Sequence, residues 1–92
     1  MKKANQLKNI DEMDKKLTLV LDLLDQECNG DGIIFNHVKY LQFLALVEDI
    51  VKLWDTVNIE NDTTEKIYIS LVIINEDFLK INKKYYDEEP YI

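Results

Sequence analysis

The sequence predicts an all-α protein, a three-helix bundle that runs up, down and up with short loops. Three stretches carry apolar residues at steps of three and four, the spacing of one face of an α-helix. The segments between them are short and polar, and the chain of 92 residues holds only two glycines and one proline. Helices joined by short loops pack side by side. We therefore expect one helical domain over residues 1–92, with helices at about 9–28, 36–57 and 63–86.

The first predicted helix, about 9–28, has one apolar face. Asn9 is expected to cap its start, and acidic residues in the first turn suit the positive end of the helix dipole. Gly30 is expected to end it. The apolar positions are Ile10, Met13, Leu17, Val20, Leu21, Leu24 and Cys28.

The second predicted helix, about 36–57, has an apolar side that covers roughly half of its circumference. Its charged residues, Lys39 apart, gather on the other side. A helix with so broad an apolar side is expected at the centre of the bundle, in contact with both others. The apolar positions are Tyr40, Phe43, Leu44, Leu46, Val47, Ile50, Val51, Leu53, Trp54 and Val57.

The third segment allows two interpretations. The stretch Ile67–Ile74 is β-branched and alternates like a strand, which would give an α+β fold. A helical spacing nevertheless continues across the whole segment, and "DTTE" with Asp62 in the capping place resembles a capping box. The spacing favours a helix, with the strand as the alternative. The helical line is Ile67, Leu71, Ile74, Phe78, Ile81 and Tyr85.

The formal charge is −7, and every basic residue is a lysine. Direct binding to nucleic acid is not expected, because it depends on clustered basic residues that neutralise phosphates. With one cysteine and no apolar run of signal-peptide or membrane-span length, the sequence predicts a cytoplasmic protein without a membrane partner. The abundance of Lys, Ile and Asn without Arg indicates AT-rich coding, as in a low-GC bacterium or its phage.

The stretch "CNGDGIIFNHV", Cys28–Val38, resembles the middle of an EF-hand calcium loop. Aligned with that loop, position 12 falls on Val38, which has no carboxylate to offer as the bidentate ligand. We therefore interpret the stretch as a bend whose glycines supply positive φ angles, with a calcium-responsive module as the alternative. The loop positions 1, 3, 5, 6 and 8 fall on Glu27, Asn29, Asp31, Gly32 and Ile34.

No other combination of residues predicts catalysis or a cofactor. Cys28 and His37 flank the bend, but nucleophilic catalysis needs a third, orienting group. Zinc needs four nitrogen or sulfur ligands, and the chain has one His and one Cys. We therefore expect no metal or cofactor and no enzymatic activity.

The two outer helices each carry a second apolar line beyond the stripe that a bundle requires. Contiguous exposed apolar residues mark interfaces, although a wider core would also bury such lines. Residues 87–92 form an acidic, aromatic tail that suits docking on a basic groove or simply aids solubility. The candidate interface residues are Leu19, Leu23, Tyr68, Val72, Leu79, Tyr86 and, in the tail, Tyr91.

These observations predict a small acidic module that binds another protein as a regulator, adaptor or inhibitor. A phage-type inhibitor of a nucleic-acid-processing or defence enzyme fits the carboxylate surplus, because basic grooves attract an acidic surface. Self-association into a homo-oligomer is the other use of such a surface. A degenerate, EF-hand-like calcium module is the alternative function.

Overall fold

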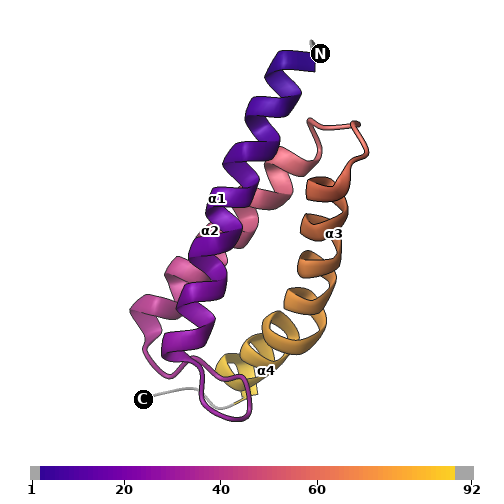
Figure 1. The fold of residues 1–92 in the computed structure, drawn as a ribbon. Helices are drawn as coiled ribbons and strands as arrows, with labels where there is room; N and C mark the ends of the chain where they lie inside the picture. The colour runs from indigo at the N-terminus through magenta and orange to yellow at the C-terminus, as the bar shows by residue number, and fades with distance from the viewer. Residues whose placement is uncertain (1–2, 89–92) are drawn as a thin grey trace.

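The computed structural model describes residues 3–88, and this part of the chain forms an all-α three-helix bundle. The third helix, which we call the third rod, is a continuous run of α3, the π-helix η1 and α4 (Figure 1). The predicted fold class is therefore confirmed, and Ile67–Ile74 is helical instead of a strand. The elements are α1 (Lys3–Glu27), α2 (His37–Trp54), α3 (Asp62–Ile74), η1 (Asn75–Leu79) and α4 (Lys80–Glu88).

The first helix begins at Lys3, six residues before the predicted cap at Asn9. The extra turns carry polar side chains that bind the connection between α2 and α3. The Gln6 side chain is buried and accepts a hydrogen bond from the Asn58 backbone at 2.9 Å. Asn9 donates from its side chain to the Thr56 hydroxyl at 2.8 Å. These tertiary hydrogen bonds hold Asn9 inside the helix, although its capping preference predicts that the helix begins there.

The second and third helices start close to the predicted positions. The Asn36 side chain caps α2 by accepting from the backbone N–H groups of Val38 and Lys39. The start of α3 is shifted by one residue, because Asn61 and not Asp62 is the cap. Asn61 and Thr64 form a reciprocal capping box, in which each side chain accepts from the other's backbone N–H.

The end of α2 lies at Trp54, before the predicted end at Val57. The Thr56 hydroxyl donates to the Leu53 carbonyl at 2.7 Å. The backbone N–H of Thr56 binds the same carbonyl at 3.0 Å, which closes a tight turn. A side chain that bonds to the last turn competes with continuation of the helix.

The π-helix η1 shifts the buried side of the third rod by one residue. The backbone N–H of Lys80 binds the Asn75 carbonyl five residues earlier, so this segment holds one residue more than an α-helical turn. The predicted line therefore turns outward at Ile81, which is 37 % exposed, whereas the next residue, Asn82, is fully buried. The inward line continues through Asn82 and Tyr86.

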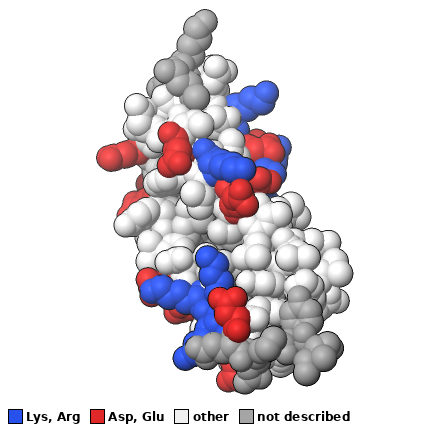
Figure 2. Space-filling view, turned by 180° about the vertical axis from the view of Figure 1, so that it is seen from behind, with Lys and Arg blue, Asp and Glu red and all other residues white. Residues whose placement is uncertain are grey.

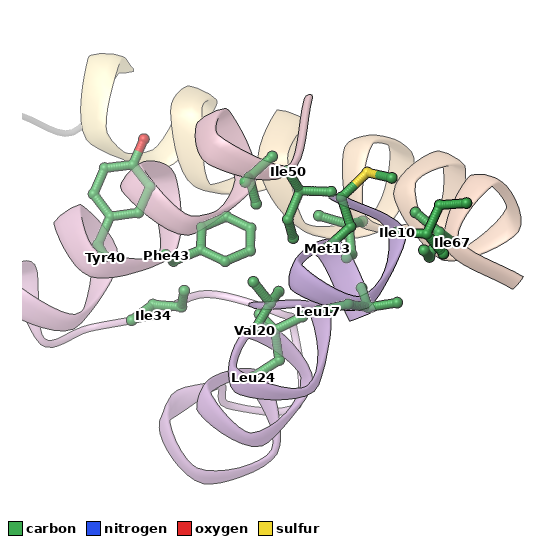
Figure 3. Close-up of a cluster of buried hydrophobic side chains, with 12 residues drawn as sticks. Ile10, Met13, Leu17, Val20, Leu24, Ile34, Tyr40, Phe43, Ile50 and Ile67 are labelled. Carbon is green, nitrogen blue, oxygen red and sulfur yellow. The ribbon is translucent and has the colours of Figure 1, made fainter. Parts of the chain in front are cut away.

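The core lies mainly between α1 and α2, which pack along each other (Figure 3). The third rod packs on α1 through α3, whereas the backbones of α2 and α3 stay apart over most of their described length. The helix whose backbone lies close to both others is therefore α1, and not α2 as its broad apolar side predicts. Two residues predicted to be in the core, Leu21 and Val51, are instead 48 % and 46 % exposed. They lie at the edges of their apolar stripes, where no neighbouring helix covers them. The buried apolar residues are Ile10, Met13, Leu17, Val20, Leu24, Ile34, Tyr40, Phe43, Val47, Ile50, Ile67 and Ile74.

Ion pairs between helices supplement this packing. Lys66 of α3 pairs with Asp14 of α1, and Lys16 of α1 pairs with Asp49 of α2 at 3.5 Å. No helix within residues 3–88 combines the length and apolar character needed to cross a bilayer.

Asn82 joins the third rod to the connection between α1 and α2. Its side-chain oxygen accepts from the Ile34 backbone N–H at 2.9 Å, and its amide nitrogen donates to the carbonyls of Gly32 at 2.9 Å and Phe78 at 2.8 Å. The hydroxyl of Tyr86, one turn later, donates to the Ile34 carbonyl. A side-chain amide has both donors and an acceptor, which is what this buried position requires.

We predict that Asn82→Ala lowers the free energy of unfolding by about 2–4 kcal/mol, because it leaves the N–H of Ile34 and the carbonyl of Gly32 without their buried partner. Urea denaturation followed by circular dichroism measures the change. Lys83→Ala, at the adjacent exposed position, is the control and is expected to change stability by less than about 0.5 kcal/mol. Equal stability of the two variants would contradict a structural role for Asn82.

Candidate functional site

The connection between α1 and α2, residues 28–36, is a bend held by its own backbone. The side-chain oxygen of Asn29 accepts from the backbone N–H groups of Asp31 and Ile33 at 2.8 and 3.1 Å. The Asn29 N–H donates to the Ile33 carbonyl at 3.1 Å. Cys28 and Ile34 form an isolated antiparallel bridge that closes the bend.

Two of the oxygen atoms that an EF-hand would direct at calcium are used inside this bend. Loop position 3 is Asn29, whose side-chain oxygen already accepts two N–H groups, and position 7 is Ile33, whose carbonyl accepts one. Val38, at position 12, lies in the first turn of α2 with its side chain exposed. No group of three His, Cys, Asp or Glu residues able to hold a metal ion is present within residues 3–88. The geometry therefore matches a bend more closely than a calcium loop.

Only one of the two glycines has the conformation expected of the bend. Gly32 has a φ of 83°, while Gly30 is not in the positive-φ region. A Cβ added to Gly32 would lie 3.3 Å from the Asp77 carbonyl oxygen and would touch the Phe78 ring. The bend thus packs directly against η1.

Cys28 and His37 have separate environments. The Cys28 thiol contacts the Gly32 carbonyl at 3.5 Å, and burial raises the pKa of this thiol. The His37 ring lies against the rings of Tyr40 and Tyr86, with centroid distances of 6.3 and 5.5 Å. A raised pKa lowers the fraction of the thiolate, the nucleophilic form of Cys28, at neutral pH.

The candidate interface residues are distributed over three places. Leu19 and Leu23 line a hollow between α1 and α2, with Leu19 exposed and Leu23 half-buried against the core. Tyr86 stacks on Tyr40 with a centroid distance of 4.2 Å, at the α4 end of the bundle. Tyr91 lies outside the described residues.

The other three candidates, Tyr68, Val72 and Leu79, meet in a groove between α2 and the third rod, which we call the α2–α3 groove. One hollow of about 290 Å³ is lined by both helices, and Trp54 and Tyr68 join it to a second hollow of about 640 Å³. The two rings stack at 6.0 Å with 28° between their planes. The first hollow is lined by Val47, Val51, Trp54, Tyr68, Leu71, Val72, Asn75 and Leu79.

The surface seen from behind the view of Figure 1 shows how charge is arranged. Uncharged surface covers the middle of this face, and charged side chains gather above and below it (Figure 2). Tyr68 is 56 % exposed and Val72 is 44 % exposed. Apolar groups at the groove are therefore accessible to a partner.

Comparisons with protein-family models, with curated proteins and with solved structures found no match for this chain.

Sequence reasoning missed the contribution of α2 to the groove. The helical periodicity of α2 assigns Val51 and Trp54 to its core-facing side. Periodicity groups residues by face but does not show which neighbour covers that face. The sequence feature that indicates a second contact surface on α2 is the width of its apolar side, which exceeds what one neighbouring helix buries. The connection 57–61, which lines the second hollow, carried no such signal.

We predict opposite outcomes for the two glycines. Gly32→Ala should destabilise the fold by about 1–2 kcal/mol, because alanine is strained at positive φ and its Cβ approaches the Asp77 carbonyl. Gly30→Ala, with open space around its Cβ, is the matched control and should be neutral or stabilising by up to about 1 kcal/mol. Thermal unfolding compares the two. Equal destabilisation by both changes would refute the distinction.

We also predict that the Cys28 thiol reacts with iodoacetamide at a higher pH in the folded chain than in the same chain unfolded in urea. Desolvation favours the neutral thiol, so its thiolate fraction at a given pH is lower when folded. The midpoint of the pH–rate curve is the measurement, because steric shielding lowers the rate without moving the midpoint. Identical midpoints would contradict the prediction.

Proposed function

We propose that this chain is a protein-interaction module whose docking surface is the α2–α3 groove. The observation that carries the proposal is the accessible apolar lining of this groove, contributed by two helices whose backbones stay apart. Isolated exposed apolar residues are ordinary on soluble proteins, whereas a contiguous set in a concave surface usually marks a binding site. A partner that covers these side chains gains about 25 cal/mol for each Å² of apolar area removed from water.

The groove suits recognition by side chains. Its walls are helices, whose interior backbone groups are hydrogen-bonded within the helix, so no free sheet edge is offered along residues 3–88. The lining of the third rod extends from Tyr68 to Leu79. Eleven helical steps correspond to about 16 Å, enough for roughly three turns of a partner helix. A helix laid into the groove is the docking mode that matches these features.

A regulatory or inhibitory role agrees best with the rest of the molecule. The net charge of −7 favours encounter with a basic partner and speeds association with it. The thiol of Cys28, one of the residues singled out for chemistry, has a pKa raised by burial, which lowers its thiolate fraction at neutral pH. We therefore propose an adaptor or inhibitor that acts by occupying a surface of another protein, with enzymes that bind nucleic acid as one suitable class.

We predict that Val72→Asp abolishes docking while leaving the fold intact. A probe for the groove is a synthetic amphipathic peptide of about 18 residues with leucines on one face, the length of a helical groove ligand. Its affinity should fall at least about 10-fold, because a carboxylate in the middle of the groove must be desolvated. Fluorescence anisotropy of the labelled peptide measures binding, and circular dichroism checks the fold.

The matched control is Ile69→Asp, an equally exposed position of α3 that lines none of the described hollows. It should bind the peptide as the wild type does. Unchanged binding by Val72→Asp, or equal losses in both variants, would contradict docking at the groove.

A further inference from the structure

The hollow at one end of the α2–α3 groove differs chemically from the remainder. It lies where α2 passes into α3 and has a volume of about 640 Å³. Three carboxylates, Glu60, Asp62 and Glu65, line it together with the rings of Trp54 and Tyr68, and no lysine does. The adjoining hollow, lined from Val47 to Leu79, contains no charged residue. The groove therefore has an acidic, aromatic end and an uncharged end.

Building on the proposed function, we infer that the occupant of the groove is an amphipathic helix with a cationic side chain at one end, best an arginine, which enters this acidic, aromatic hollow. The apolar face of the same helix covers Val51, Val72 and Leu79. This assignment places the cationic end of the partner helix at the connection between α2 and α3.

The carboxylates are available for a partner. Within residues 3–88, Glu60, Asp62 and Glu65 form no ion pair, and the lysines nearest to the hollow in sequence are paired elsewhere. Lys52 binds Glu48 at 3.1 Å, and Lys66 binds Asp14. An incoming cation therefore meets three carboxylates without displacing a lysine of this chain.

The aromatic rings favour one kind of cationic side chain over the other. Trp54 and Tyr68 stack on each other, and both line the hollow. A guanidinium group stacks on aromatic faces and donates to carboxylates in a planar fork, whereas an ammonium group acts as a compact point charge. This combination favours arginine over lysine.

Helix capping explains only part of the acidic cluster. Asp62 and Glu65 lie in the first turn of α3, where negative charge stabilises a helix. Glu60 precedes the cap Asn61 and lies outside the first turn, where this stabilisation is strongest. Stabilisation of the helix start therefore explains Asp62 and Glu65 best, and it does not explain why the rings of Trp54 and Tyr68 line the same hollow.

The test uses three versions of the amphipathic peptide, with arginine, glutamine or glutamate at one end and otherwise identical sequence. At about 50 mM salt we expect the wild type to bind the arginine peptide about 10-fold more tightly than the glutamine peptide, and the glutamate peptide most weakly. The preference should shrink in about 0.5 M salt. Trp54 is the only tryptophan and lines both hollows, so its fluorescence reports directly on occupancy of the groove.

The variant Glu60→Gln/Asp62→Asn/Glu65→Gln should lose the arginine preference and retain binding of the glutamine peptide. The matched control is Asp22→Asn/Asp25→Asn/Asp31→Asn, which changes the net charge by the same amount at exposed positions outside the groove. This control variant should keep the preference for the arginine peptide. Circular dichroism of both variants verifies that the helices remain.

The outcomes separate the inference from the proposed function. If the wild type binds the arginine and glutamine peptides equally, or if the control loses as much preference as the groove variant, the cationic subsite is wrong while docking at the groove stands. If no peptide binds and Trp54 fluorescence does not change, both are wrong. If sedimentation shows a dimer of this chain that Val72→Asp dissociates, a second copy is the occupant and the inference is overturned.

Discussion

The buried amide of Asn82 is the contact on which the placement of the third rod depends. The side chain joins the backbone of the bend at Gly32 and Ile34 to the rod itself at Phe78. At the other end of the bundle, Gln6 and Asn9 bind the connection that leads into the rod. The rod is therefore held near its two ends by polar contacts, while Ile67 and Ile74 supply its buried apolar anchors. This arrangement leaves α2 and α3 apart and opens the groove.

The same arrangement explains which parts of the molecule could be predicted from sequence. Helical spacing is a local property, so it located all three helices and most of their inward residues, including the segment Ile67–Ile74 that resembles a strand. The start of α1 and the end of α2 were wrong by several residues, because Gln6, Asn9 and Thr56 are fixed by contacts with distant or backbone partners. The extra residue of η1 was also missed, since Ile81 and Tyr85 continue the α-helical spacing without interruption.

The candidate site was predictable in part for a related reason. Tyr68, Val72 and Leu79 were identified as a line in excess of what a bundle needs, and the structure places them on the wall of the α2–α3 groove. Trp54 and Val51 on the facing wall were missed, because the distance between two helices is not encoded in the periodicity of either one. From the sequence, only the total net charge could be used to predict the kind of partner. Its concentration at one end of the groove follows from the path of the connection between α2 and α3.

The π-helix has a consequence for how this chain tolerates changes in length. From Ile74 onward, the inward residues Phe78, Asn82 and Tyr86 follow at steps of four. The regular α-helical line would instead pass through residues 81 and 85, one position before Asn82 and Tyr86. Removal of a single residue within 75–79 would restore a regular α-helix and carry the amide and the phenol onto the inward face of that helix. The π-helix η1 therefore accommodates one extra residue within less than two turns. The same side of α4 faces the bend with or without that residue.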